Sequence, residues 1–180
     1  MEEITICLKG IRSSDCPPQL LTVLEQLRIE LVEFRFGFIT VRKPHHLKLA
    51  AIEAQLESSG FIPIRGKQGQ LVEKVKHLVF LMFKDDQFQK SRLNVSHHIA
   101  THTGKSYAHI SRMFSKHEGM TLERFIIEQR IDHAKQLLLS RCLTLAEIAT
   151  RLGYSSVQHL SSQLHEISGM TVRMYLQSNN

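Results

Sequence analysis

With 180 residues and 42% hydrophobic content, the chain has enough apolar side chains for one or two cores, which excludes disorder throughout. No stretch approaches the roughly 20 apolar residues of a membrane helix, and the initial segment MEEITICLKG is acidic where a signal peptide is basic, so we expect a cytoplasmic protein without a membrane partner. The net charge of +6 arises in residues 67–180, with 15 basic and 9 acidic side chains against eight of each in residues 1–66, and a basic segment of this kind is typical of nucleic-acid-binding domains.

Residues 1–66 alternate between strand and helix patterns. A strand pattern over 3–9 is followed by a helical run after Pro17-Pro18, and two alternating segments that flank Gly37 predict an antiparallel pair with a tight turn. Pro44 is expected to start a second helix that ends at Gly60, and residues 61–64 are expected to form a last, edge strand. This order, βαββαβ, predicts an α+β, ferredoxin-like N-terminal domain.

The segment 65–70 contains two glycines and no large apolar residue, so we place the domain boundary there. Beyond it the apolar residues recur at helical spacing, beginning with a stripe over 71–83 that we interpret as core rather than as a dimer seam. Residues 67–180 are therefore expected to form an all-α domain.

An internal repeat occupies this second domain. The segment SYAHISRMFSKHEGMTLERF, residues 106–125, aligns without a gap with SVQHLSSQLHEISGMTVRMY, residues 156–175. In both copies a short helix pattern and a glycine turn come first, and then a serine, Ser106 or Ser156, is placed to cap the next helix. Helix, glycine turn and capped helix form the helix-turn-helix pattern, which predicts two such units, at about 94–117 and 144–167.

The segment 121–139 lies between the two units and contains neither Gly nor Pro, so we expect one long helix. Its nineteen residues span roughly 28 Å at about 1.5 Å each. This length is close to the roughly 34 Å between successive major-groove faces of a duplex. One chain is therefore expected to read two adjacent sites on double-stranded DNA.

In a helix-turn-helix unit the second helix lies in the major groove and presents its outward side chains to base edges. Arg112 is suited to a bidentate bond with guanine and Gln158 to a pair with adenine, while Ala108 or Val157 is suited to contact a thymine methyl group. The candidate DNA-contacting residues are Tyr107, Ala108, Ser111, Arg112, Ser115 and Lys116 in the first unit and Val157, Gln158, Ser161, Ser162 and His165 in the second.

The motifs SYAHISRMFSKHEGMT, RIDHAKQLLL and LTLAEIATRLGYSSVQHL, followed by SGMT, resemble the AraC-type DNA-binding domain over about residues 70–177. The resemblance implies a bacterial transcription regulator in which two helix-turn-helix units, joined by a long helix, contact adjacent major grooves. Ser162 stands where the family often has a basic residue. We therefore expect the second unit to contribute less base-specific energy than the first.

The segments GIRSSDC, which ends at Cys16, and AAIEAQLESSGF resemble heavy-metal-associated domains of βαββαβ form. Such domains bind a soft metal with a Cys-x-x-Cys pair, but here Ser13 stands at the first position. Cys16 is therefore either an ordinary loop cysteine, which we favour, or one ligand of a metal site completed by a second chain or by His45 and His46. The resemblance makes this domain a candidate for effector or metal sensing or for homodimer formation, and no cofactor is expected.

The alternative to a transcription regulator is a metal-trafficking or metal-responsive module with a helical fusion partner. An enzyme is not expected, because no positioned base, phosphate loop or paired carboxylate accompanies Cys16 or Cys142.

Three cysteines form no even framework, so reduced thiols are expected, with Cys7 in the core. Three histidines at one-turn spacing could hold a metal, but we interpret them as phosphate contacts or solvated residues: His97, His98 and His102. The two histidines at equivalent positions of the repeat, His109 and His159, are interpreted as helix-packing or backbone-contact residues.

Overall fold

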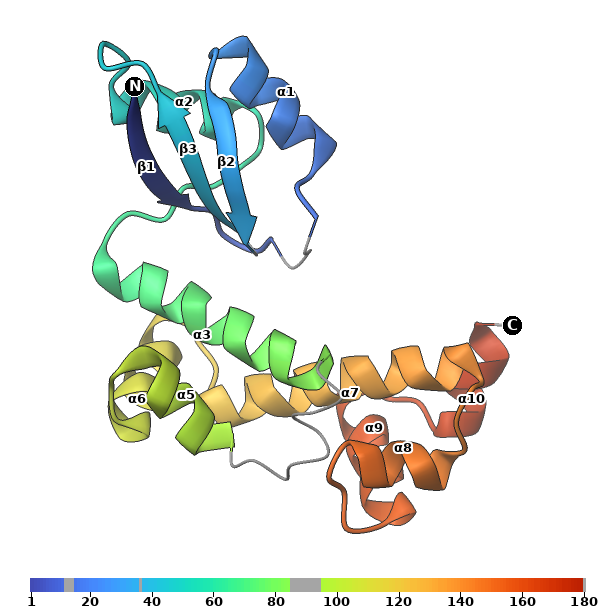
Figure 1. The fold of residues 1–180 in the computed structure, drawn as a ribbon. Helices are drawn as coiled ribbons and strands as arrows, with labels where there is room; N and C mark the ends of the chain where they lie inside the picture. Colours follow the sequence, from blue (N-terminus) through green and yellow to red (C-terminus); the bar gives the residue numbers. More distant parts are fainter. Residues whose placement is uncertain (12–14, 36, 85–94, 180) are drawn as a thin grey trace. The chain divides into compact units, whose positions relative to one another are not determined.

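The computed structural model describes residues 1–11, 15–35, 37–84 and 95–179. The chain divides into two compact units, residues 1–77 and 78–180 (Figure 1). Helix α3 (Lys67–Lys84) begins in the first unit and ends in the second, and it starts within the segment 65–70 where the sequence places the boundary.

The N-terminal unit is a small antiparallel sheet with two helices on one face. Its strands lie in the order β1-β3-β2, so the central strand pairs with both neighbours. The elements are β1 (Glu2–Cys7), α1 (Pro18–Gln26), β2 (Glu30–Arg35), β3 (Phe38–Lys43) and α2 (Leu49–Ser58).

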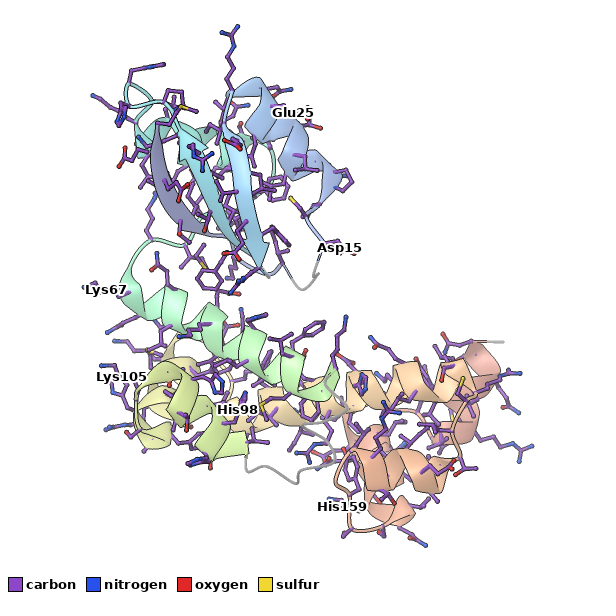
Figure 2. The ribbon with its side chains drawn as sticks, in the orientation of Figure 1. Asp15, Glu25, Lys67, His98, Lys105 and His159 are labelled. Atoms are coloured by element: carbon purple, nitrogen blue, oxygen red, sulfur yellow. The ribbon has the colours of Figure 1, made fainter. Side chains whose placement is uncertain are left out.

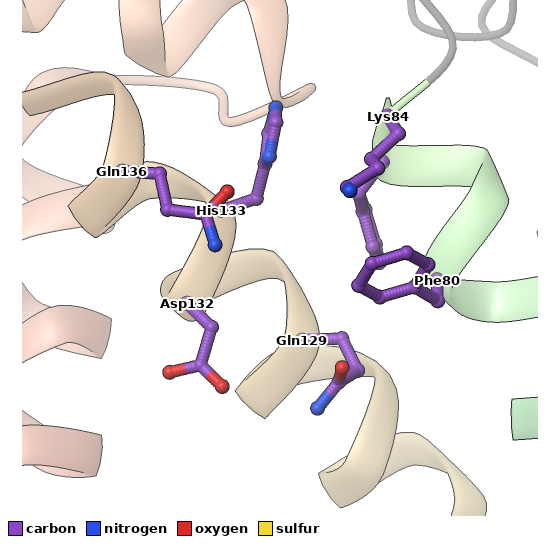
Figure 3. Close-up of a pocket in the computed structure, with 7 residues that line it drawn as sticks. Phe80, Lys84, Gln129, Asp132, His133 and Gln136 are labelled. Atoms are coloured by element: carbon purple, nitrogen blue, oxygen red, sulfur yellow. The ribbon is translucent and has the colours of Figure 1, made fainter. Parts of the chain in front are cut away.

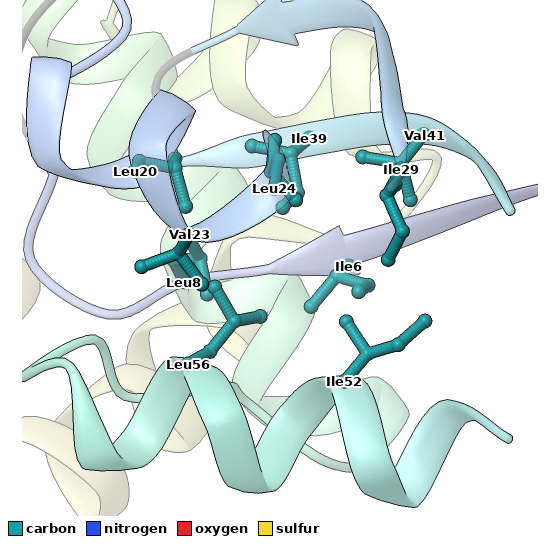
Figure 4. Packing of buried hydrophobic residues seen from close by; sticks show 10 residues of the cluster. All are labelled: Ile6, Leu8, Leu20, Val23, Leu24, Ile29, Ile39, Val41, Ile52 and Leu56. Atoms are coloured by element: carbon teal, nitrogen blue, oxygen red, sulfur yellow. The ribbon is translucent and has the colours of Figure 1, made fainter. Parts of the chain in front are cut away.

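The core of this unit lies between the sheet and the two helices (Figure 4). Because side chains alternate along a strand, every second strand residue faces the helices, as Ile39 and Val41 do with no exposed surface. The helices contribute buried side chains at helical spacing: Leu20, Val23 and Leu24 from α1, and Ile52 and Leu56 from α2.

The turn before β3 requires glycine. Gly37 has a φ of +80°, and a Cβ at this position would lie 2.7 Å from the carbonyl oxygen of Leu8. The same close approach lets Gly37 accept a hydrogen bond from the amide of Leu8 at 2.6 Å. A side chain would therefore be strained and would also displace the end of β1.

Two predicted elements of this unit were wrong. The last strand, expected at 61–64, does not form, and an isolated antiparallel bridge joins Leu8 and Pro63 instead. Proline has no N–H group to donate, so it interrupts a ladder of backbone hydrogen bonds. The second helix begins at Leu49 and not at Pro44, because Pro44 first accepts a hydrogen bond from the amide of Leu47 at 3.1 Å and closes a turn.

The second unit is all helical over its described residues, as the sequence predicts. Helices α5 and α6 pack against each other, as do α8 and α9, and α7 contacts α6, α8 and α9 (Figure 1). The helices are α5 (Val95–Thr103), α6 (Tyr107–Glu118), α7 (Leu122–Ser140), α8 (Leu145–Arg151), α9 (Val157–Ser168) and α10 (Val172–Ser178).

The two helix-turn-helix units bury matching positions of the repeat. Ile110 and Phe114 on α6 are fully buried, and so are Leu160 and Leu164 on α9. The centre of the Phe114 ring lies 5.2 Å from that of the Phe125 ring, and this contact packs the first helix-turn-helix unit against α7. Among the described residues, no helix is both long enough and apolar enough to cross a bilayer.

Candidate nucleic-acid interface

Both candidate recognition helices, α6 and α9, begin with a serine cap. The Ser106 hydroxyl accepts a hydrogen bond from the His109 amide at 3.3 Å, and the Ser156 hydroxyl accepts one from the His159 amide at 3.1 Å. Each helix ends at a glycine with a left-handed backbone conformation that suits this residue. The repeat therefore extends from the sequence to the hydrogen bonds that define the helix ends.

The outward face of α6 carries two cations. Ala108, Arg112 and Lys116 are exposed and lie one helical turn apart, opposite the buried Ile110 and Phe114. Arg112 donates from Nε to the carbonyl oxygen of Ala108 at 3.3 Å. This bond uses one of the five guanidinium donors and holds the Nε end of the group. The four N–H donors on the two Nη atoms do not take part in it.

The three remaining candidates on α6 are half-buried and form hydrogen bonds within the protein. The Tyr107 hydroxyl donates to Oε1 of Glu123 at 3.0 Å, and the Ser111 hydroxyl donates to the same oxygen at 3.5 Å. Burial raises the pKa of Tyr107, and the bond to Glu123 raises it further. The Ser115 hydroxyl donates to the carbonyl oxygen of Ser111 at 2.9 Å. Tyr107 and Ser111 therefore connect α6 to α7, whereas the bond of Ser115 lies within α6.

The outward face of α9 is polar but holds little positive charge. Gln158, Ser162 and His165 are exposed, whereas Val157 and Ser161 are half-buried. An amide and a hydroxyl can form hydrogen bonds with base edges, but neither neutralises a phosphate. The α9 face therefore offers weaker electrostatic attraction to DNA than the α6 face.

The turn before α9 is held by a cluster that the sequence analysis did not identify. Tyr154 is buried, and its hydroxyl donates to Oε1 of Gln163 at 2.7 Å. Its ring meets the ring of His159 edge-on at 5.2 Å, and the Arg130 guanidinium lies 5.5 Å from the Tyr154 ring centroid. Burial raises the pKa of Tyr154 to about 12, which keeps the hydroxyl protonated as a donor. The sequence signal for this cluster is the dipeptide Gly153-Tyr154, because a large aromatic side chain next to a turn glycine is expected to pack against the helices that the turn joins.

The equivalent histidines of the repeat, His109 and His159, have different neighbours, and Figure 2 labels His159 together with His98 of α5. His159 packs on Tyr154, and its Nδ1 lies 3.3 Å from the Ser155 hydroxyl. His109 is exposed. On α5, the rings of His98 and His102 lie 4.0 Å apart, and His102 Nδ1 is 2.9 Å from the carbonyl oxygen of His98.

Helix α8 starts with a reciprocal pair of hydrogen bonds. The Thr144 hydroxyl accepts from the Glu147 amide at 3.2 Å, and the Glu147 carboxylate accepts from the Thr144 amide at 2.7 Å. This backbone donor lowers the pKa of Glu147. The two bonds satisfy amides that the first turn of a helix otherwise leaves without partners.

We expect Thr144→Ala to lower the free energy of unfolding of the helical unit by about 1 kcal/mol, since it removes the cap of α8. The measurement is urea unfolding followed by circular dichroism. Thr150→Ala is the matched control, because this exposed threonine on the same helix donates to the carbonyl oxygen of Ala146 within the helix and does not cap its start. Equal losses in the two variants would show that the cap does not set the stability of α8.

The candidate metal ligand Cys16 lies in an apolar environment. Its side chain packs against the core cluster of the N-terminal unit, and burial raises the pKa of its thiol, which disfavours the thiolate that binds metal. Ser13, the other position of the motif, lies outside the described residues. Among the residues described, no three His, Cys, Asp or Glu side chains gather in a way that could hold a metal ion. Cys7 is buried in the sheet, and burial is the main cause that raises its pKa to about 12.

A small pocket lies between the end of α3 and α7 (Figure 3). Its space of about 30 Å³ has room for water rather than for an effector molecule. His133 Nε2 is buried there without a hydrogen-bond partner among the described residues. The lining residues are Phe80, Phe83, Lys84, Gln129, Asp132, His133 and Gln136.

This pocket predicts a pH dependence of stability. Burial lowers the pKa of His133, a hydrogen bond with the Gln136 side chain partly opposes this shift, and the charge of Lys84 adds to the lowering. The folded protein therefore takes up a proton less readily than the unfolded chain, so stability is present above the ordinary histidine pKa of about 6.5 and is lost as the pH falls below it. We expect His133→Gln to reduce the loss of unfolding free energy between about pH 7.5 and pH 5.5, measured by urea unfolding.

The control is His117→Gln, which changes an exposed histidine of α6. His98 is also buried in part with a lowered pKa, so some acid sensitivity should persist in both variants. A His133→Gln protein that loses as much stability on acidification as the original chain would contradict the assignment.

The helical unit therefore contains two helix-turn-helix pairs on one long helix. Residues 99–178 match the family model described as a helix-turn-helix domain. The solved C-terminal domain of AraT, a response regulator from Geobacillus stearothermophilus, has the same fold, with a TM-score of 0.51, 23% sequence identity and coverage of 63% of this chain and 88% of that one.

Two curated proteins are similar to the chain in sequence. One is the uncharacterized HTH-type transcriptional regulator YfiF of Bacillus subtilis, with 32% identity over 115 residues, which are 61% of this chain and 35% of that protein. The other is the HTH-type transcriptional regulator ArgR of Pseudomonas aeruginosa, with 23% identity over 112 residues, 62% of this chain and 33% of that protein. The chain thus spans about a third of the length of the curated relatives that it matches.

Proposed function

We propose that this protein is a transcription regulator that binds double-stranded DNA sequence-specifically, with α6 and α9 each entering a major groove. One observation carries the proposal. Two helices with the same serine cap, the same buried positions and an exposed polar face contact one helix of 19 residues. At about 1.5 Å per residue that helix is roughly as long as the distance between successive groove faces.

The exposed side chains support different roles for the two helices. Arg112 combines a charge with a planar set of donors that matches the guanine edge, and Lys116 one turn later suits a backbone phosphate. On α9, Gln158 can pair with adenine, while Ser162 brings no charge. The first unit is accordingly proposed to supply most of the affinity and the second to extend the site.

The test is selection of random duplex DNA by the purified protein at near-physiological salt with competitor DNA. Enrichment of two short sequence blocks about one helical turn apart is expected for reading by both helices. Enrichment of one block would reject two-groove reading, and binding that shows no sequence preference would reject the proposal as a whole.

The N-terminal unit is proposed to be a degenerate ferredoxin-like domain that regulates or associates the protein. Support comes from the sheet order β1-β3-β2 together with backbone bonds from Lys9 to Ile62 and from Ile64 to Cys7, which place residues 62–64 beside β1 where a fourth strand would lie. The elevated pKa of Cys16 argues against metal trafficking as its task. A homodimer or a small effector is the partner proposed for this unit.

A further inference from the structure

The first turn of α7 contacts both candidate recognition helices through two adjacent residues. Glu123 accepts hydrogen bonds from Tyr107 and Ser111 on α6, at 3.0 and 3.5 Å. Arg124, the next residue, donates from Nη1 to Oε1 of Glu166 on α9 at 3.2 Å. A single turn of α7 therefore contacts α6 through Glu123 and α9 through Arg124.

These contacts are not a by-product of the duplication. At the equivalent positions of the second copy, Arg173 replaces Glu123 and Val157 replaces Tyr107, so the carboxylate and its phenolic donor both disappear. Arg124 is matched by Met174, which cannot form an ion pair. Together the two contacts therefore connect both candidate recognition helices, α6 and α9, to the same turn of α7.

We propose that Glu123 and Arg124 are positioning residues that fix the orientation and distance of α6 relative to α9. They thereby set the spacing of the two base blocks that the protein selects. The inference rests on the proposed function. Because both side chains start from consecutive residues of one rigid helix, a rotation of α6 relative to α9 has to break at least one contact. Loss of either contact leaves the base-facing residues intact but lets the distance between the two helices vary.

Exposed ion pairs are individually weak, so the expected effect is a shift in preference and not a loss of binding. The Arg124 side chain is 42% exposed and that of Glu166 is 67% exposed. Removing the pair should therefore reduce the preference for the original block spacing, over a spacing longer or shorter by one base pair, by about two- to fivefold.

The experiment compares block spacings selected from random duplex DNA by the original chain and by four variants. Glu123→Ala removes the acceptor for α6, whereas Glu123→Gln keeps an amide oxygen at that position and should restore the original spacing. Glu166→Ala removes the contact to α9. Glu128→Ala is the matched control, because Glu128 is another partner of Arg124, at 3.0 Å, and this bond lies within α7.

The expected result is a broadened spacing with unchanged block sequences in Glu123→Ala and Glu166→Ala, and the original spacing in Glu123→Gln and Glu128→Ala. Original spacing in all four variants would overturn the inference while leaving the proposed function in place. If the unmodified protein selects only one block, two-groove reading has failed first, and if it selects none, the proposed function has failed as a whole. Unfolding curves of every variant identify any change that arises from stability, since lower stability reduces the bound fraction but does not alter the spacing.

Discussion

Replacing Phe114 with alanine is expected to lower the free energy of unfolding of the helical unit by about 3–5 kcal/mol, the largest effect of any substitution proposed for this unit. Phe114 is fully buried, and its ring lies 5.2 Å from that of Phe125. The substitution leaves a cavity where α6 meets α7, and it removes an aromatic contact that contributes beyond its buried area. Urea unfolding monitored by circular dichroism measures the loss.

Leu139→Ala provides the comparison for this change. Leu139 lies near the end of α7 and is 41% exposed, so its truncation removes less buried surface and leaves no enclosed cavity. A loss of about 0.5 kcal/mol or less is expected there. Similar losses in both variants would contradict the assignment of Phe114 to a packed core between the recognition helix and the linking helix.

The second large effect is expected in DNA recognition. Arg112→Ala should reduce discrimination at one base position of the selected site by about 1–3 kcal/mol, which is roughly 5- to 150-fold in relative affinity. The reason is that a guanidinium can donate two parallel hydrogen bonds to a guanine, and Arg112 is exposed on the outward face of α6 with one donor anchored on Ala108. Competition binding between the selected duplex and duplexes mutated at each position measures the discrimination.

Lys116→Ala is the matched control, since this residue is exposed one helical turn later on the same face. A residue that contacts a phosphate weakens binding to every sequence alike and lowers the salt dependence when it is removed. Discrimination that survives in Arg112→Ala, with a uniform loss of affinity at all sites, would mean that Arg112 also contacts the backbone and that other residues read the bases.

Most of the helical unit could be predicted because its signals are local. The helix over 95–103 and the continuous helix that ends near Ser140 follow from apolar periodicity and from the absence of Gly and Pro. The buried faces of α6 and α9 follow the same spacing, with Ile110 and Leu160 at matching buried positions. The N-terminal unit was harder, because whether a short segment such as 61–64 becomes a strand depends on the strand that it meets and on the donor that Pro63 lacks.

Within the helical unit, the sequence by itself determined which segments are helices, where the two copies begin, and which side of α6 and α9 faces the core, since caps and periodicity act over a few residues. Only the tertiary structure decided which outward residues are engaged inside the protein. Tyr107 and Ser111 belong to the outward pattern of α6 yet bond to Glu123 on α7, and Arg124 reaches Glu166 on α9 across 42 positions of the chain. Such pairings depend on how separate helices pack against one another, and no local periodicity encodes that geometry.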